Sequence, residues 1–336
     1  MANTFKAFRI HTIDGKPVCR FEELSMRDID EGDVVIEVAY SAVNYKDAMA
    51  ARGVGKNIRT NRACIGGVDL SGMVVSSADA RFDAGDKVIV TNYELGTEHD
   101  GAYAAYACVP GDWVVPLPEE LTLYEAMGLG TCGLTAGLAL DRLERAGLSP
   151  TDGPVAITGA TGGVGSLAVD IFSRRGYDVI AISGKKEQEG FLMSIGAKSV
   201  MSRAELLENR AVLAPLWFAG ALDNVGGEYL DRLAARLQPH GKLAVAGMAV
   251  GAELSTTVLP LILRAIDILG INVSRQLRMA ERRRLWRRLA TDMKPVHLDK
   301  TSRPIPFEAL DDAMDKFFEQ NSVGRVIVEV GAKAPH

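Results

Sequence analysis

Cysteine is scarce in this sequence and follows no metal-binding or disulfide pattern. Only 4 of the 336 residues are Cys, and no two of them are spaced as CxxC. Scattered thiols are typical of a reducing compartment, and a structural zinc cluster needs closely spaced Cys or His pairs. We therefore expect a cytoplasmic protein with neither a disulfide framework nor a structural zinc site.

The chain also lacks an excess of positive charge and a long hydrophobic run. Its formal net charge is -5, so no overall basic field attracts nucleic acid. The longest weakly polar run, 126–140, is shorter than the roughly 20 residues of a membrane-spanning helix. The opening residues MANTFKAFRIHTIDG carry charges throughout and no apolar core, so we expect no secretory signal in them. Contents of 47% hydrophobic and 24% charged residues are typical of a globular protein, and the length favours two domains.

The first third of the chain favours short strands and turns. DVVIEVAYSAVNY alternates apolar and polar residues, GDKVIV is a compact strand after a Gly-Asp turn, and GAYAAYACVPGDWVVPLP contains two more strands. Gly and Pro are frequent here, and helical periodicity is sparse. This region predicts an antiparallel, partly barrel-like β domain.

The pattern changes near Leu123, where YEAMGLGTCGLTAGLALDRL predicts a helical linking element rich in small residues. From Gly153 onward, apolar strands and amphipathic helices follow one another, as in a parallel sheet covered on both faces. Such a series predicts a doubly wound nucleotide-binding domain. A later segment, GRVIVEV, is a further strand that could rejoin the first domain. The predicted strands of the second domain are Val155–Thr158, Val179–Ser183, Ser199–Met201, Ala221–Val225, Leu243–Gly247 and Leu269–Val273.

A glycine-rich turn follows the first of these strands. ITGATGGVG, 157–165, leads into a helix whose apolar residues recur at helical spacing. Glycines in a strand–turn–helix context let a pyrophosphate approach the main chain, and the helix N-terminus adds amide groups and partial positive charge. The alternative is a plain glycine turn without a ligand.

The end of the second strand indicates which dinucleotide binds. NAD-preferring folds usually place Asp or Glu there to accept hydrogen bonds from the ribose. Here the chain has Ser183, Gly184, Lys185 and Lys186, and a hydroxyl and an ammonium group suit a 2′-phosphate. This favours NADPH over NADH. The alternative is that both lysines only begin the next helix in solvent.

Several motifs in order resemble the medium-chain dehydrogenase/reductases over essentially the whole chain. They are VNYKDAMAARG (43–53), GVDLSGMV (67–74), GDKVIV (85–90), GTCGLTAGLAL (130–140), ITGATGGVG (157–165) and LDNVGG (222–227). NYKDA, SGK and ILRAIDILGINV resemble the quinone-oxidoreductase-like branch, and above all its NADPH-dependent acryloyl-CoA reductases.

The resemblance implies an α/β chain with a GroES-like, partly barrel catalytic domain and a doubly wound Rossmann domain with a six-stranded parallel sheet. The implied segments are 1–124 for the catalytic domain, 125–274 for the Rossmann domain, and 275–336 for a part that returns to the catalytic domain. It also implies a cofactor bound in the cleft and a homodimer joined near Leu269–Val273.

The resemblance also implies individual roles. Tyr45 would contact the nicotinamide, and Met248 and Ile262 would line the nicotinamide side. Thr161, Gly162, Gly163 and Val164 would face the pyrophosphate, and Ser183, Gly184, Lys185 and Arg203 would surround the 2′-phosphate.

Zinc-dependent members of the family carry Cys where this chain has Asn44 and His where it has Val68. Val68 cannot bind zinc, so we expect no metal. Without zinc, the protein does not strongly polarise a substrate carbonyl, so hydride addition suits an already activated alkene such as an enone, a quinone or an unsaturated thioester. With the thioester, the product of hydride addition is an enolate that needs hydrogen-bond donors and one proton. Asn44 and Tyr45 are the candidates for these roles, with water as an alternative proton source. The alternative readings are a core tyrosine and a turn-stabilising asparagine.

The predicted reaction is therefore NADPH-dependent reduction of acryloyl-CoA to propanoyl-CoA. A quinone or enone reductase with the same cofactor, and an NADPH-responsive binding protein, remain open. ERRRLWRR, 281–288, carries five arginines that could bind CoA phosphates or form a solvated face.

Overall fold

The structure is a computed structural model that describes residues 4–54, 58–318 and 322–331. The chain divides into two compact units, each assembled from separate stretches of sequence. Unit 1 is Met1–Thr131, Ser274–Trp286 and Ser302–His336, and unit 2 is Cys132–Val273 and Arg287–Thr301. Helices α2 (Leu123–Arg145) and α8 (Met279–Ala290) begin in unit 1 and continue into unit 2. Within the described ranges, no helix is both long and apolar enough to span a bilayer.

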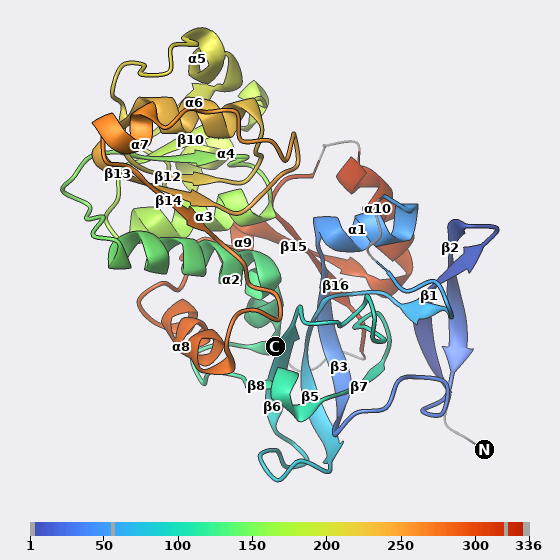
Figure 1. The fold of residues 1–336 in the computed structure, drawn as a ribbon. Coiled ribbons are helices and arrows are strands. Elements are labelled where there is room, and N and C mark those ends of the chain that lie inside the picture. The colour runs from blue at the N-terminus through green and yellow to red at the C-terminus, as the bar shows by residue number, and fades with distance from the viewer. Residues whose placement is uncertain (1–3, 55–57, 319–321, 332–336) are drawn as a thin grey trace. The chain divides into compact units, whose positions relative to one another are not determined.

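Unit 1 is built mainly on antiparallel sheets, as the alternating patterns predict. Its larger sheet has the strand order β15-β16-β3-β5-β6-β8, with β7 also paired to β3, and a smaller sheet has the order β2-β1-β4. β16 runs antiparallel to β3 with Val326 opposite Val43, so segments from both ends of the chain lie side by side (Figure 1). The strand in GRVIVEV is thus confirmed. The elements are β1 (Phe5–Ile13), β2 (Lys16–Leu24), β3 (Val34–Val43), α1 (Tyr45–Arg52), β4 (Cys64–Ile65), β5 (Asp69–Ser77), β6 (Lys87–Thr91), β7 (Tyr106–Val109), β8 (Val115–Pro116), β15 (Ser302–Pro306), α10 (Leu310–Phe318) and β16 (Arg325–Glu329).

Helix α1 is an element that the hydrophobic pattern does not reveal. Its buried side chains are Asp47 and three alanines, which are too small to give a clear apolar stripe. The helix begins after Asn44, whose backbone N–H donates to Asp47 Oδ2 at 2.8 Å. It ends at Gly53, whose φ of 71° lies in the left-handed region that glycine adopts readily. Tyr45 is therefore the first residue of a helix.

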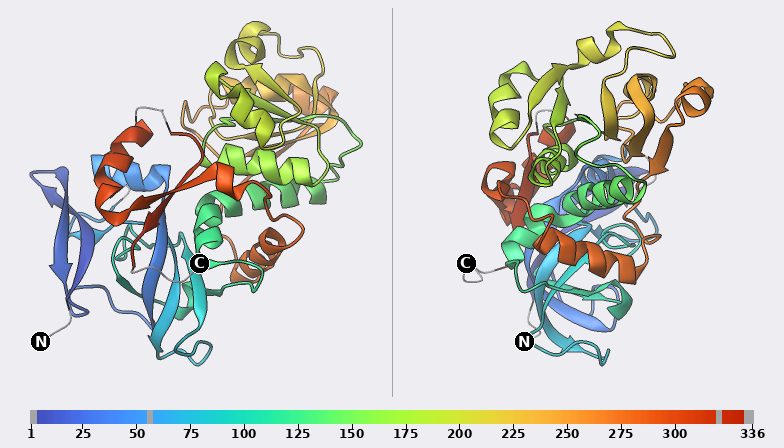
Figure 2. Two further views of the ribbon diagram at one scale, coloured as in Figure 1. Left: turned by 180° about the vertical axis from the view of Figure 1, so that it is seen from behind. Right: turned by 90° about the vertical axis from the view of Figure 1, so that its left-hand side faces the viewer.

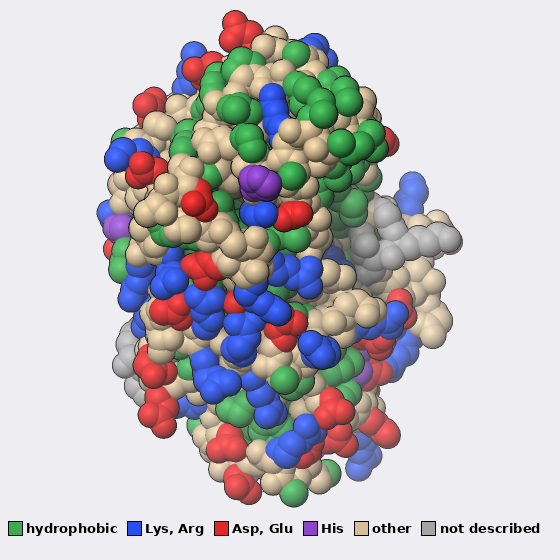
Figure 3. All heavy atoms as spheres, turned by 60° about the vertical axis from the view of Figure 1, so that its left-hand side comes forward, with side chains coloured by type: hydrophobic (Ala, Val, Ile, Leu, Met, Phe, Trp, Pro, Cys, Tyr) green, Lys and Arg blue, Asp and Glu red, His purple; other side chains and the backbone are tan. Residues whose placement is uncertain are grey.

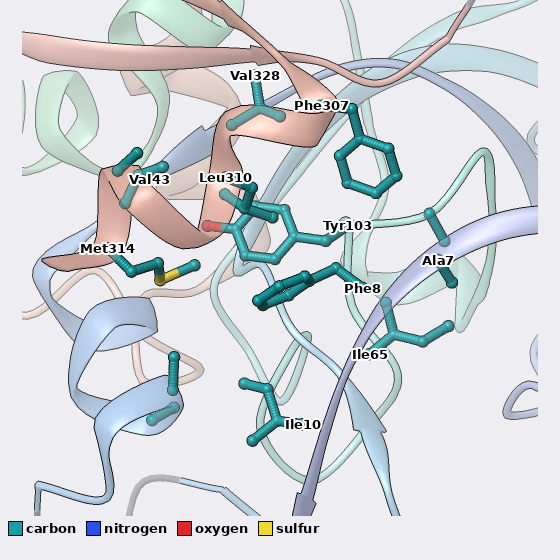
Figure 4. Packing of buried hydrophobic residues seen from close by; sticks show 14 of the residues in the cluster. Ala7, Phe8, Ile10, Val43, Ile65, Tyr103, Phe307, Leu310, Met314 and Val328 are labelled. Atoms are coloured by element: carbon teal, nitrogen blue, oxygen red, sulfur yellow. The ribbon is translucent and has the colours of Figure 1, made fainter. Parts of the chain in front are cut away.

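The core of unit 1 joins elements from both ends of the chain. Tyr103 lies in the middle of apolar side chains that include Phe8 from β1, Val328 from β16 and Leu310 from α10 (Figure 4). The Phe8 and Tyr103 rings meet edge to face with centroids 6.3 Å apart. Burying a Phe or Leu side chain contributes roughly 1.5–3 kcal/mol, so this cluster ties the C-terminal strands firmly to the N-terminal ones.

Unit 2 contains the predicted six-stranded parallel sheet, with the order β11-β10-β9-β12-β13-β14. Helices α5 and α6 cover one face of this sheet, and α2 and α3 cover the other (Figure 1). Figure 2 shows the same layers from two further sides. The chain starts at β9 in the middle and builds outward in both directions, which is the doubly wound topology. The elements are β9 (Val155–Thr158), α3 (Gly163–Arg174), β10 (Val179–Ser183), α4 (Glu189–Ser194), β11 (Ser199–Ser202), α5 (Arg203–Glu208), β12 (Phe218–Asp223), α6 (Glu228–Arg236), β13 (Leu237–Val245), α7 (Leu259–Leu263), β14 (Asp267–Gly270) and α9 (Leu298–Thr301).

The predicted strand bounds are confirmed for β9 and β10, are one residue short for β11, which ends at Ser202, and differ more for β12, β13 and β14. β9 and β10 agree with prediction to the residue. β12 and β13 begin earlier, at Phe218 and Leu237, where an irregular register pairs residues that show no strand pattern. β14 spans Asp267–Gly270, so it begins before the predicted Leu269, and the predicted residues 271–273 lie outside the strand. Edge pairing depends on long-range contacts more than on local pattern.

Candidate functional site

The predicted phosphate-binding residues of unit 2 follow the carboxyl ends of neighbouring strands. In the parallel register Ile182 lies opposite Thr158, and Ser202 lies opposite Ser183. The glycine-rich turn after β9, the residues after β10 and Arg203 after β11 therefore meet at one edge of the sheet. This is the edge at which doubly wound folds bind their ligands.

The glycines of the turn have different structural roles. Gly159 has a φ of 59°, and a Cβ on Gly165 would lie 2.2 Å from the Gly159 carbonyl oxygen, so both permit the close approach of α3 to the strand. Gly162 precedes α3, and a Cβ there would have its nearest neighbour at 3.4 Å. The space beside Gly162 and the first-turn amides of α3 fit a pyrophosphate. Thr161, which is buried, and Gly162 lie in this turn, and Gly163 and Val164 are the first two residues of α3.

Two cationic side chains gather at the end of β10. Ser183 ends the strand, and its Oγ accepts the Lys185 backbone N–H at 3.0 Å. Arg203 begins α5, and its Cδ and Nε would each lie 3.1 Å from a Cβ on Gly184, so its stem lies over that glycine. Burial lowers the pKa of Lys185; Glu187 opposes this shift and Arg203 adds to it. An anion between Lys185 and Arg203 would relieve this repulsion, so the four predicted residues fit a 2′-phosphate.

Met248 and Ile262 are placed differently. Met248 comes three residues after β13 at the same sheet edge, and its Cα would lie 3.1 Å from a Cβ on Gly226. Ile262 lies in α7, and Arg264, at the end of that helix, accepts the His240 N–H in the earlier half of β13. Both side chains are about 70% exposed (Met248 69%, Ile262 70%). Their contact with the nicotinamide stays a prediction.

In unit 1 the two proposed catalytic residues have opposite environments. Tyr45 is 46% exposed at the start of α1, whereas Asn44 is 5% exposed. Asn44 Nδ2 donates to Asp69 Oδ2 at 2.9 Å, and its Oδ1 accepts from Arg325 Nη1 at 2.8 Å. The Asn44 carboxamide is therefore held inside the unit, while the tyrosine ring faces outward.

The partners of Asn44 belong to a buried polar network that the sequence analysis missed. Asp69 is 0% and Arg325 1% exposed, and Arg325 Nη2 lies 3.3 Å from Asp69 Oδ2. The Thr131 backbone N–H donates to the same carboxylate oxygen at 2.9 Å, and the Thr131 hydroxyl donates to Oδ1. α2 is broken at Gly130, whose φ of 47° and ψ of -147° turn this N–H toward Asp69. The available signal was Asp69 as the single charge in the apolar run GVDLSGMV, and Arg325 at the start of the apolar run GRVIVEV.

Asp47 lies against this network with its carboxyl group fully enclosed. Its Oδ1 accepts the Val68 N–H at 3.1 Å, and its Oδ2 accepts the Asn44 N–H. Burial raises the pKa of Asp47 to about 7, the hydrogen bond from Asn44 opposes the shift, and the Asp69 charge adds to it. The start of α1 is thus held at Val68 and at the first residue of β5 through the carboxyl groups of Asp47 and Asp69.

The residues around Asn44 do not fit a zinc ion. Val68 is 1% exposed and offers only carbon atoms, and the guanidinium of Arg325 already contacts Asn44 and Asp69. A divalent cation beside this permanent positive charge would be repelled. Among the described residues, no three His, Cys, Asp or Glu side chains are grouped so that they could hold a metal.

Two arginines of the arginine-rich stretch of α8 make hydrogen bonds or ion pairs with other parts of the protein, which a fully solvated face would not do. Arg282 is 0% exposed and donates to the Thr91 hydroxyl at 2.9 Å, so the solvated interpretation is wrong for this residue. Arg288 contacts the carboxylates of Asp141 at 2.8 Å and Asp292 at 2.7 Å. Arg287 is exposed.

Comparison with known proteins gives the class of the chain. The family model of the alcohol dehydrogenase GroES-like domain matches residues 30–119, and that of the zinc-binding dehydrogenases matches residues 163–291. The chain belongs to the medium-chain dehydrogenase/reductase superfamily, which confirms the resemblance. The mismatch with zinc at Asn44 and Val68 is a departure from the second model's description.

Within this superfamily the chain is similar to two full-length curated relatives. YhfP of Bacillus subtilis, which carries the name of a quinone oxidoreductase, is 42% identical over 98% of this chain and 100% of its own length. The acrylyl-CoA reductase AcuI of Ruegeria pomeroyi is 39% identical over 95% of this chain and 96% of its own.

Solved structures agree with this fold and differ in their nucleotide. The structure of Bacillus subtilis yhfP with NAD bound has a TM-score of 0.95 at 41% identity and covers 98% of this chain and 100% of that one. Escherichia coli YhdH with bound NADPH has a TM-score of 0.93 at 37% identity and covers 97% of this chain and 100% of that one.

Proposed function

We propose that this protein uses NADPH to reduce the activated C=C bond of acryloyl-CoA, giving propanoyl-CoA. The observation that carries the cofactor is the pair of cations, Lys185 and Arg203, beside Ser183 at the end of β10. The relative named as an acrylyl-CoA reductase, 39% identical over nearly the whole chain, supports the substrate. The Arg325 guanidinium, which contacts both Asn44 and Asp69, disfavours a metal at this place, and an activated alkene needs no Lewis acid.

When bound, NADPH would provide the hydride that adds to the β-carbon of the thioester. The chain holds the pyrophosphate with the turn from Thr161 to Val164 and the 2′-phosphate with Ser183, Lys185 and Arg203. The exposed ring of Tyr45 contacts the nicotinamide, and its hydroxyl donates the α-carbon proton or orients a water that does so. Asn44 keeps Tyr45 in place through its buried hydrogen bonds. Met248 and Ile262 pack on the nicotinamide side.

The decisive experiment follows NADPH absorbance with acryloyl-CoA, with a simple quinone or enone, and with no acceptor. A kcat/KM at least about tenfold higher for acryloyl-CoA, a difference of about 1.4 kcal/mol, supports the proposal. A higher value for the quinone would replace it with the quinone reductase that the name of the 42% identical relative favours. Tight NADPH binding without turnover of any acceptor would favour a binding protein.

The role of Tyr45 has its own test. We expect Tyr45→Phe to lower kcat about 10²- to 10⁴-fold if the hydroxyl moves the proton, because general acid catalysis contributes that much. The NADPH dissociation constant and the melting temperature should stay near the wild-type values, since the residue is half exposed. An unchanged kcat would remove the hydroxyl from the mechanism.

We also propose that the protein is a homodimer joined through β14. This strand is the last in its sheet, so one of its edges can pair with a second copy. Hydrophobic side chains gather over the part of unit 2 that carries α7 (Figure 3), where Val258 and Leu263 are each 63% exposed. Light scattering should give twice the chain mass, and Leu263→Glu should shift it toward the monomer. A monomeric wild type would end this part of the proposal.

A further inference from the structure

A buried ion pair lies next to the residue that immediately precedes Tyr45. Arg325 and Asp69 come from β16 and β5, on either side of β3 in the same sheet. Asn44 follows the end of β3, and its carboxamide takes one hydrogen bond from Arg325 and gives one to Asp69. Asn44, the residue before α1, is therefore held by side chains from the two strands that flank β3.

The hydrogen bonds use the full shape of the arginine. Arg325 Nη1 donates to Asn44 Oδ1 at 2.8 Å and to the Val43 carbonyl at 3.3 Å, while Nη2 donates to Asp69 Oδ2 and to the Met127 carbonyl, each at 3.3 Å. One planar fork therefore joins the end of β3, β5 and the first part of α2. A lysine carries the same charge but cannot span these acceptors with a single nitrogen.

We propose that Asp69 and Arg325 are positioning residues that hold Asn44, and through it the first turn of α1, so that Tyr45 keeps the orientation needed for the reaction. This inference rests on the proposed role of Tyr45. Asp47 completes the arrangement, because its carboxyl group bonds the backbone N–H of Asn44 and that of Val68, the neighbour of Asp69. We expect such a network to affect the rate through the orientation of Tyr45, because a misplacement of about 1 Å at a reacting group can lower the rate about 10²-fold.

The experiment compares Arg325→Lys and Asp69→Asn with the wild type in the full-length protein. Steady-state kinetics are measured with NADPH and the acceptor that the wild type reduces best. We expect kcat to fall about 10- to 100-fold, while the KM and dissociation constant for NADPH change less than about twofold, because unit 2 holds the phosphates. Asp69→Asn keeps the side-chain shape, so it serves if Arg325→Lys does not fold.

A second readout does not depend on turnover. The protein is labelled with 3-fluorotyrosine, and the resonance of Tyr45 among the 8 tyrosines is assigned with Tyr45→Phe. In Arg325→Lys this resonance should shift or broaden more than the others. If the wild type reduces no acceptor, the proposed function fails, yet this spectrum still decides whether the network orients Tyr45.

Arg59→Lys is the matched control. Arg59 is 8% exposed in the same unit and pairs with Asp100 at 2.6 Å and with Asp30. It should lower the melting temperature as Arg325→Lys does, while kcat and the Tyr45 resonance stay at the wild-type values. The proposal is overturned if Arg325→Lys and Asp69→Asn keep the wild-type kcat, if the Tyr45 resonance does not respond, or if Arg59→Lys lowers kcat equally.

Discussion

The sheet edge of unit 2 and the buried network of unit 1 are two different ways to build a site. The first consists largely of backbone: a glycine turn, a helix N-terminus, and two cations that follow strand ends. The second consists of side chains that depend on one another, with Asn44 between Asp69 and Arg325. A backbone site tolerates changes beside it but not a Cβ within it, whereas a side-chain network is sensitive to the shape and charge of each member.

The largest effect should separate two glycines of the same turn. A Cβ at Gly165 would lie 2.2 Å from a backbone oxygen, so we expect Gly165→Ala to destabilise the protein by about 3 kcal/mol and to abolish most NADPH binding. At Gly162 the nearest atom is 3.4 Å away. Gly162→Ala should keep the melting temperature and weaken NADPH about tenfold, because its methyl group occupies the pyrophosphate side. Denaturation and fluorescence titration check both, and equal stability losses would contradict the assignment.

The next effect concerns the choice of nucleotide. Removing a charged hydrogen-bond donor costs about 1.5–3 kcal/mol, so Lys185→Ala should weaken NADPH about 10- to 100-fold and leave NADH unchanged. Lys186→Ala is the matched control, because this neighbour is exposed beyond the strand end and should not alter the ratio. Dissociation constants for both nucleotides decide the matter. An equal loss of NADH affinity would mean that Lys185 does not contact the 2′-phosphate.

A smaller effect should appear in the pH dependence of unit 1. Asp47 binds a proton up to about pH 7 when folded, whereas its ordinary pKa is 3.8. Its stabilising contribution is therefore full below pH 3.8 and is lost as pH rises through 7, at no more than about 1.4 kcal/mol for each pH unit. The free energy of unfolding of the wild type minus that of Asp47→Asn should fall between pH 4 and pH 8. A difference that rises with pH would show that the carboxylate form is the stabilised one.

The smallest effect should come from Arg287. This residue is exposed on α8, whereas Arg282 is buried and Arg288 is ion-paired. If α8 does not contact the thioester, Arg287→Ala should change the KM for acryloyl-CoA less than about twofold, in line with the weak energetics of exposed charges. A tenfold higher KM at low salt, lost at high salt, would instead place CoA phosphates on this helix.

The same contrast explains what the sequence could predict. β9, β10 and the glycine turn were predictable because hydrophobic runs and glycines act locally, within a few residues. Helix α1 was not, because its buried face is alanine and aspartate. The network around Asn44 was also missed, because it joins positions 25 and 281 residues away from Asn44, and no local pattern reports such pairs. Arg203 was predicted as a 2′-phosphate residue only from the resemblance to the family, because no spacing in the sequence indicates it.

The pairing of β16 with β3 has a consequence for how the molecule is made. A ribosome releases all of residues 132–273 before β16 emerges, so the Rossmann sheet can assemble while the first sheet still lacks a strand. Arg325 is synthesised 256 residues after Asp69, and at about 5–20 residues per second this takes roughly 13 to 50 s. During that interval Asp69 lacks the guanidinium that pairs with it in the folded protein, and the sheet that holds β3 and β5 lacks β16.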